Sequence, residues 1–214
     1  MSVQLLGASL VGRRRQVDDD TIMLGTARAL GRLGYARLTL AAVAEEVGLS
    51  PASLIQRFGS KRDLLLAFFD WDMVVRQARV ADLRRLHSSP LAALRARFLK
   101  WADFIPAPTT VANLLSLSVE SVTDPEFRER ANRRVKAQEA EVTALLEEAV
   151  ASGELAPGDI PRLSRVLLAA ETGALLHWAV AQGGPAREWI DDAFDVIIGP
   201  WLPGRQSEPV KEAE

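Results

Sequence analysis

The stretch TLAAVAEEVGLSPASLIQRFGSKRDLL, residues 39–65, decides the fold of this chain. Thr39 can cap a short helix whose apolar residues recur at three- and four-residue spacing. Gly48 then allows the left-handed backbone conformation that a tight turn needs. Ser50, followed by Pro51, opens a second short helix. Two short helices joined by a glycine-containing turn have the spacing of a helix-turn-helix.

The second helix of this motif leaves compact and polar side chains on its outer face, as entry into a DNA major groove requires. Glutamine can bond adenine bidentately, and arginine can bond guanine or a phosphate. The residues predicted to contact DNA are Thr39, Pro51, Ala52, Ser53, Gln56, Arg57 and Lys61. Taken alone, the pattern also fits a generic helical hairpin with a solvated face.

A basic triplet, Arg13, Arg14 and Arg15, precedes the first expected helix. We expect it to form a flexible arm that adds phosphate or minor-groove contacts, and the alternative is a solvated tail. Residues 1–63 hold nine lysines and arginines against six acidic residues, whereas the rest of the chain holds 17 against 22. A mildly basic head on an acidic body is expected if only the head meets phosphates, although chance gives the same difference.

Apolar residues keep helical spacing along the whole chain of 214 residues, and no segment alternates with a period of two. The prediction is an all-α protein of about nine helices, in which a three-helix helix-turn-helix domain precedes a helical bundle. The predicted parts are a basic arm (1–17), a DNA-binding domain (18–60), a ligand-binding and dimerisation domain (61–203) and a disordered tail (204–214).

Several classes of site have no support in the sequence. Cysteine is absent, which rules out disulfides and thiolate ligands and fits a cytoplasmic location. No apolar run is long enough for a membrane span, and the N-terminal residues make a poor secretory signal. His87 and His177 are the two histidines, and neither belongs to a metal-ligand cluster or a nucleophile motif. We therefore expect no cofactor, no metal and no enzyme.

The stretch 39–65 resembles the N-terminal signature of the TetR family of transcription regulators. The matching residues are Thr39, Ala44, Gly48-Leu49-Ser50, Leu54, Phe58, Ser60-Lys61 and Leu64, together with Leu33-Gly34-Tyr35 before them. The resemblance covers about residues 19–69. It implies a sequence-specific DNA-binding regulator, a repressor released by a small-molecule effector. The alternatives are a helical interaction protein with a degenerate helix-turn-helix, and an enzyme.

One position departs from the family pattern. Ile55 occupies the place where the family often has a tyrosine that contacts the phosphate backbone, and Arg57 replaces a second aromatic residue. Isoleucine cannot donate a hydrogen bond. We therefore expect Arg57 to take over a phosphate or base contact and Ile55 to be partly buried.

The C-terminal part resembles the family more weakly. The resemblance implies a homodimer, formed through two helices at about 161–182 and 185–201, on a near-palindromic operator. The apolar stripes expected there are Leu163, Leu167, Ala170, Ala174 and Trp178 on one helix and Trp189, Ala193, Phe194, Ile197 and Trp201 on the other. The alternative is that these stripes only build the core of a monomer.

The resemblance also implies a pocket for a small effector among the middle helices. Apolar and aromatic walls with few polar groups suit a largely apolar ligand. The candidate lining residues are Trp101, Phe104, Asn113, Leu117, Glu120, Glu171, His177 and Trp178. For each of these residues, a place in the core or on the surface is the alternative.

Overall fold

The computed structural model describes residues 17–204, and within that range it contains nine α-helices, one 3-10 turn and no strand. The prediction of an all-α fold is confirmed. The helices are α1 (Asp19–Arg37), α2 (Leu40–Glu46), α3 (Pro51–Phe58), α4 (Lys61–Leu86), α5 (Pro90–Ala102), α6 (Pro108–Thr123), α7 (Pro125–Ala151), α8 (Ile160–Ala181) and α9 (Ala186–Ile198), followed by the turn η1 (Gly199–Trp201).

Short polar side chains close the N-terminal ends of the first four helices. Thr39 Oγ1 accepts a hydrogen bond from the Ala42 amide at 3.1 Å, and Ser50 and Ser60 cap α3 and α4 in the same way. Asp18 caps α1, and its hydrogen bonds with Thr21 lower the pKa of the Asp18 carboxyl group. Each cap satisfies an amide that the helix itself leaves free, so the sequence fixes these helix starts locally.

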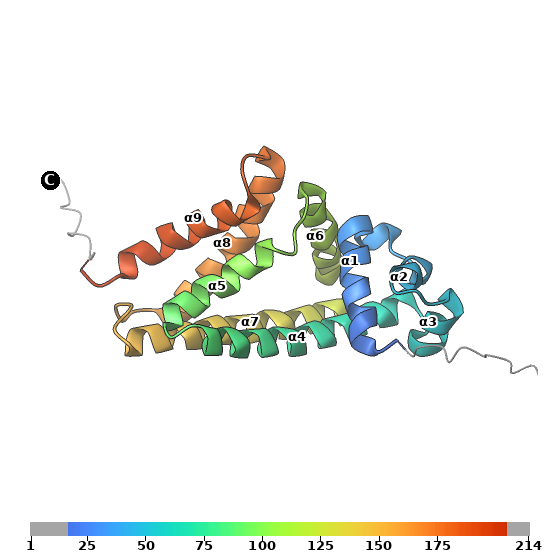
Figure 1. The fold of residues 1–214 in the computed structure, drawn as a ribbon, viewed down its shortest axis with the longest axis horizontal. Helices are drawn as coiled ribbons and strands as arrows, with labels where there is room; N and C mark the ends of the chain where they lie inside the picture. Colours follow the sequence, from blue (N-terminus) through green and yellow to red (C-terminus); the bar gives the residue numbers. More distant parts are fainter. Residues whose placement is uncertain (1–16, 205–214) are drawn as a thin grey trace, which may run out of the picture.

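The N-terminal helices share one apolar core at one end of the molecule (Figure 1). Its fully buried side chains include Leu30 of α1, Val43 of α2, Leu54 of α3 and Leu64 of α4. Leu117 of α6 and Phe127 of α7 enter the same core. The helix-turn-helix is therefore attached to the body through shared packing as well as through the chain.

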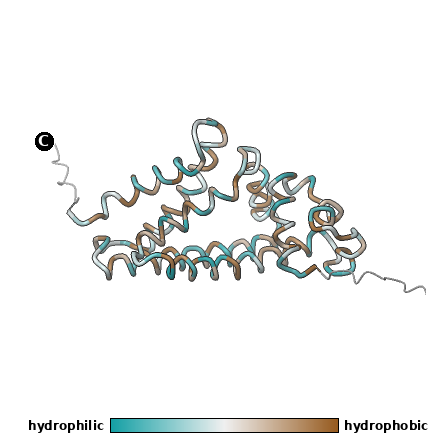
Figure 2. The backbone as a smooth tube through the Cα atoms, viewed as in Figure 1, coloured by the Kyte–Doolittle hydropathy of each residue, from teal (hydrophilic) through white to brown (hydrophobic). Residues whose placement is uncertain are grey.

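The remaining helices form the body around a second apolar core. The long helices α4 and α7 lie side by side, and α5 packs against both of them. Helix α8 packs against α7, and α9 lies on α5 and α8 (Figure 1). Apolar and polar residues alternate turn by turn along α4 and α7, as expected for helices with one face in the core (Figure 2). Helix α6 packs against both α1 and α8, so it connects the two cores.

Gly25 lets α1 approach the end of α2. A Cβ added at Gly25 would lie 2.2 Å from Val47 Cγ1, a distance that real side chains do not adopt. We expect Gly25→Ala to lower the free energy of unfolding by about 1–3 kcal/mol through overpacking, in spite of the higher helix propensity of alanine. Chemical denaturation measures this change.

A second variant separates packing from propensity. Val47→Ala removes the methyl group that the new Cβ would strike, so Gly25→Ala combined with Val47→Ala should lose less stability than the two single changes added together. If Gly25→Ala alone stabilises the protein, by the difference in helix propensity between alanine and glycine, then α1 does not approach α2 as closely as described.

Candidate functional site

The outer face of α3 is open to solvent. Leu54 is fully buried and points into the N-terminal core, whereas Pro51, Ala52, Gln56 and Arg57 are exposed. Ser53 is half-buried, and its hydroxyl group lies 2.8 Å from that of Ser50. The side of α3 that the sequence assigned to DNA is therefore not covered by the rest of the described chain.

The turn before α3 has the backbone geometry that the sequence predicted. Gly48 has φ of +69°, and a Cβ added there would meet nothing within 4 Å. Glycine is thus required at position 48 for its backbone conformation and not for lack of space, because other residues are strained at this positive φ. The Leu49 amide donates to the Ala44 carbonyl at 2.8 Å and closes the turn.

Two of the predicted DNA-contacting cations bind α1 in this structure. Arg57 donates to the Val17 carbonyl at 2.7 Å and pairs with Asp19 at 2.6 Å. Lys61 donates to the Tyr35 carbonyl at 2.9 Å, with its ammonium nitrogen 4.3 Å from the centroid of the Tyr35 ring. Both side chains lie near the α3 face and contact residues at the two ends of α1.

The expectation that Ile55 is partly buried is wrong, because its side chain is 54% exposed. Leu54 takes the inward position of α3, and the next residue in a helix turns about 100° away from it. Arg13, Arg14 and Arg15 lie outside the described residues, so the basic arm stays a prediction.

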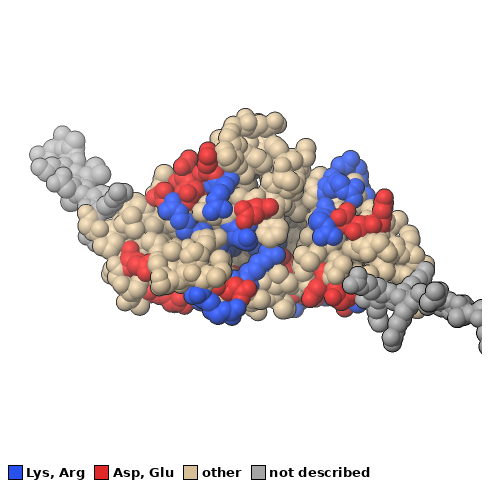
Figure 3. Space-filling model, in the orientation of Figure 1, with Lys and Arg blue, Asp and Glu red and all other residues tan. Residues whose placement is uncertain are grey.

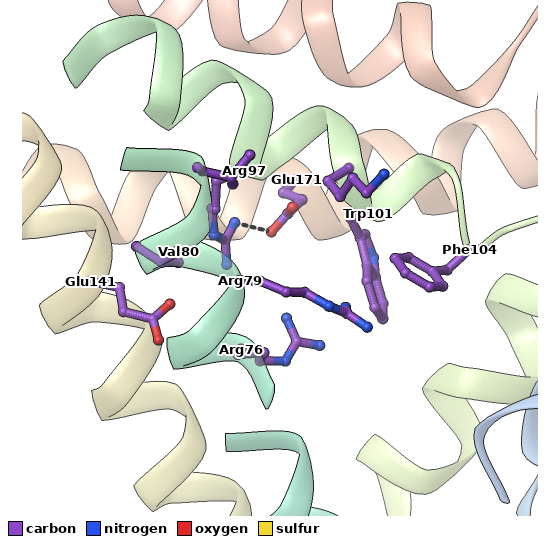
Figure 4. Close-up of a pocket in the computed structure, with 10 residues that line it drawn as sticks. Arg76, Arg79, Val80, Arg97, Trp101, Phe104, Glu141 and Glu171 are labelled. Atoms are coloured by element: carbon purple, nitrogen blue, oxygen red, sulfur yellow. Dashed lines mark hydrogen bonds and ion pairs between the residues drawn. The ribbon is translucent and has the colours of Figure 1, made fainter. Parts of the chain in front are cut away.

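A small cavity of about 40 Å³ lies among α4, α5, α7 and α8 (Figure 4). That volume holds a few water molecules. Trp101 and Phe104 form an aromatic wall, and Val80 and Leu83 add an apolar one. The charged residues of the lining are Arg76, Arg79, Arg97, Lys100, Glu141 and Glu171.

Some charged side chains of this pocket form ion pairs and others do not. Arg97 and Glu171 form an ion pair at 2.9 Å with side chains that are 7% and 11% exposed. Burial raises the pKa of Glu141, an effect that the neighbouring arginines oppose, Arg97 most strongly. On the face of the body shown in Figure 3, cationic and anionic side chains intermingle. The pocket therefore combines aromatic and aliphatic walls with charged side chains.

Comparison with known families covers both parts of the chain. The family model described as "Bacterial regulatory proteins, tetR family" matches residues 22–68, and the model "Tetracyclin repressor-like, C-terminal domain" matches residues 87–201. The chain belongs to the TetR family of bacterial regulatory proteins. It is accordingly a DNA-binding transcription regulator with α2 and α3 as its helix-turn-helix.

Solved structures share the fold along nearly their whole length. A TetR transcription regulator from Haloarcula marismortui is 23% identical, with a TM-score of 0.70, and the match covers 86% of this chain and 97% of that one. A TetR-family regulator from Agrobacterium tumefaciens is 26% identical, with a TM-score of 0.65 and coverage of 85% and 93%. FadR from Bacillus subtilis, solved with stearoyl-CoA, is 16% identical, with a TM-score of 0.64 and coverage of 85% and 98%. No curated protein matches the chain.

The pocket of this TetR-family chain includes three of the eight residues suggested for effector binding, namely Trp101, Phe104 and Glu171. His177 is exposed on α8, and Trp178 is buried, where its indole nitrogen donates to the Gly184 carbonyl at 3.0 Å.

The other three candidates lie on α6 near α1. Asn113 donates to the Gly31 carbonyl at 2.9 Å, and Leu117 is buried in the N-terminal core. Burial raises the pKa of Tyr35, and the charge of Glu120 adds to this rise. These residues face α1 and are absent from the pocket lining.

Sequence reasoning named Glu171 but missed the other charged residues of the pocket lining, Arg97 among them. The helical spacing already placed Arg97 on a buried face, because it lies three residues after Leu94 and four after Ala93, which are both buried. Glu171 interrupts the longest apolar candidate segment in a similar way. A charged residue in the buried phase of an amphipathic helix needs a partner, and here each is the partner of the other.

The apolar stripe proposed for dimer contacts on α8 points mostly inward. Leu163, Leu167 and Trp178 are at most 7% exposed and belong to the core of the body. The opposite side of α8 carries exposed apolar residues, Val166, Leu176 and Val180, which are 44–79% exposed. The inward position of the predicted stripe agrees with its alternative interpretation, as part of the monomer core.

Within residues 17–204, no group of three or more His, Asp or Glu side chains is arranged to hold a metal ion. None of the helices in this range has the length and apolar character needed to cross a membrane.

Proposed function

We propose that this TetR-family protein is a cytoplasmic repressor that binds a near-palindromic operator as a homodimer and is released by a small molecule held in the body. The observation that carries the proposal is the free outer face of α3, fixed in place by the burial of Leu54. A helix presented in this way can enter a major groove with Ala52 and Gln56 at the bases.

The exposed side of α8 supports the homodimer. Val166, Ala169, Gly173, Leu176 and Val180 follow one another at alternating spacings of three and four residues, the pattern of a helix-helix seam. A Cβ added at Gly173 would meet nothing within 4 Å, so the small centre of this stripe faces away from the protomer's own core. Two copies of α8 can therefore approach closely there, and a two-fold pair would present two α3 helices to one duplex.

Two helices connect the pocket with the DNA-binding end. Helix α4 contributes Arg76 and Arg79 to the pocket lining, and Lys61 at its other end holds Tyr35 of α1. Phe104 precedes α6, whose Ser116 hydroxyl accepts from the Tyr35 amide at 2.8 Å. A ligand that displaces Phe104 or α4 can thereby move α1, and it weakens DNA binding only by its preference for the displaced form.

The test is a gel shift with the DNA upstream of the protein's own gene. We expect specific binding that weakens steeply as salt rises, because phosphate contacts release counterions. Sedimentation of the free protein should give a dimer. Absence of specific binding even at low salt would favour the helical interaction protein instead.

Arg57 provides a sharper test of the recognition helix. Its pair with Asp19 is partly solvated, with side chains 35% and 62% exposed, and exposed pairs are weak. Arg57 can therefore exchange Asp19 for a phosphate or a base. We expect Arg57→Ala to weaken operator binding by roughly tenfold for each half-site of the dimer, as loss of one charged contact does, and Asp19→Asn to leave it unchanged or strengthen it.

Quantitative gel shifts at two salt concentrations measure both variants. If Asp19→Asn weakens binding as much as Arg57→Ala, Arg57 acts by holding α1 and does not contact DNA.

A further inference from the structure

We propose that the effector of this regulator is an organic anion whose carboxylate or phosphate oxygens bind Arg79, while Trp101 and Phe104 contact its apolar part. The inference rests on the proposed function, in which the pocket among α4, α5, α7 and α8 receives the effector.

Arg79 is the cation of the pocket lining that forms no ion pair with an acidic side chain. Within residues 17–204 its guanidinium group makes no ion pair and no hydrogen bond. The other three cations of the lining each have an acidic partner: Arg76 pairs with Asp72 at 2.7 Å, Arg97 with Glu171 at 2.9 Å and Lys100 with Asp103 at 3.2 Å. Glu141, the lining's other unpaired charge, is under the influence of Arg97, Arg76 and Arg84, and Arg79 is not among the cations that act on it. The guanidinium group of Arg79 is therefore open to an anion from outside the chain.

The position of Arg79 suits such a ligand. It reaches from α4 across the pocket toward Trp101 and Phe104, beside the guanidinium of Arg76 (Figure 4). Its Cζ atom lies 4.6 Å from the centroid of the Phe104 ring, and that of Arg76 lies 5.0 Å from Trp101. Because a guanidinium that stacks on a ring keeps its N–H edge free, Arg79 can still bind an oxyanion bidentately.

The surroundings make the uncompensated charge unfavourable without a ligand. Burial lowers the pKa of Arg79 and the charge of Arg76 lowers it further, whereas the charge of Asp72 opposes this shift without reversing it. Such a charge at a binding site reduces the stability of the free protein and is retained where a ligand needs it. A bound anion would offset the unfavourable free energy of burying the Arg79 charge and of placing it beside Arg76.

The cavity volume of about 40 Å³ accepts an anionic group but not a larger apolar body. Phe104 is 43% exposed and lies in the segment between α5 and α6, so it is the part of the wall that can move outward. A ligand anchored on Arg79 therefore places its apolar part against the residue that precedes α6, the helix bound to α1.

The first test needs no ligand. We expect Arg79→Met to raise the melting temperature of the free protein by about 2–4 °C, because it removes an uncompensated, partly buried charge. The matched control is Arg85→Met on the same helix, since the Arg85 side chain is 75% exposed and does not line the pocket. A lower melting temperature for Arg79→Met than for Arg85→Met would show that Arg79 stabilises the fold, and would overturn the proposal.

The second test uses defined probes: benzoate, phenylpropionate, octanoate, octyl phosphate, the corresponding amides or alcohols, and inorganic phosphate. We expect an organic anion to stabilise the protein and weaken operator binding more than its neutral counterpart does, with an affinity at least tenfold lower in Arg79→Met and unchanged in Arg85→Met. Comparison of the carboxylates with octyl phosphate and inorganic phosphate identifies the preferred oxyanion. If no anion exceeds its neutral counterpart, or if Arg79→Met binds it equally well, the proposal is wrong.

These outcomes are distinguishable from failure of the proposed function. Arg85 lies on α4 outside the pocket lining, so Arg85→Met without ligand should bind the operator like the unmodified protein. Release of the operator by a neutral probe would overturn the anionic effector and leave the repressor intact. Loss of specific operator binding in every variant, including the unmodified protein, would overturn the repressor itself.

Discussion

Replacing Arg97 with methionine should lower the free energy of unfolding by about 3–5 kcal/mol, the usual result of removing one partner from a buried ion pair. The Arg97 and Glu171 side chains are 7% and 11% exposed, and their nitrogen and oxygen atoms lie 2.9 Å apart. Without Arg97 the Glu171 carboxylate stays in the body and loses its charged hydrogen bond. Urea denaturation followed by circular dichroism measures the change.

Two further variants test the cause. Arg97→Met combined with Glu171→Leu removes both charges, and we expect it to recover most of the lost stability, since an apolar pair of similar volume can replace a buried ion pair. Arg85→Met breaks the solvent-exposed pair with Asp82 and should change stability by less than about 1 kcal/mol. A loss of less than about 1 kcal/mol for Arg97→Met itself would mean that water reaches Glu171 and that the pair is not buried.

Replacing Gln56 with alanine should abolish most of the sequence preference of operator binding. Gln56 is exposed on the outer face of α3, and its side-chain amide can form a bidentate pair of hydrogen bonds with adenine. One such contact discriminates by about 1–3 kcal/mol, so a dimer that uses it in both half-sites should lose about 2–6 kcal/mol. Competition between operator and unrelated DNA measures the preference.

The matched control is Gln77→Ala, because Gln77 is an exposed glutamine of α4 outside the helix-turn-helix. We expect this variant to bind the operator normally. Binding to unrelated DNA should be nearly the same in the unmodified protein, Gln56→Ala and Gln77→Ala, since it depends on phosphate contacts. If Gln56→Ala lowers operator and unrelated binding equally, Gln56 does not contact a base.

Under the proposed function, one pocket serves both folding and regulation. Arg97 with Glu171 and Arg76 with Asp72 are ion pairs closed within the chain, whereas Arg79 stands beside them without such a partner. The pairs should therefore report on folding when they are mutated. Substitution of Arg79 should weaken ligand binding. In contrast to substitution of a paired arginine, it should raise the stability of the free protein.

The sequence by itself determined the helix-turn-helix. The Thr39 and Ser50 caps and the Gly48 turn are signals between neighbouring residues, and each appears in the structure as predicted. Such signals act through hydrogen bonds and backbone conformation over a few residues, so they survive without knowledge of the rest of the chain. The error at Ile55 came from expecting an apolar side chain without a hydrogen-bond donor to be partly buried, whereas the helical phase turns it away from the core that Leu54 enters.

Only the tertiary structure decided which helices meet in the body, and with them the pocket and the exposed side of α8. Helical periodicity shows that Arg79, Trp101 and Glu171 belong to helices with a buried face, but it does not say that these three faces enclose one cavity. On α8, residues such as Leu167 and Leu176 are equally apolar, yet one is 2% and the other 44% exposed. The physical reason is that burial depends on the neighbour that each helix face finds, and packing between distant segments chooses that neighbour.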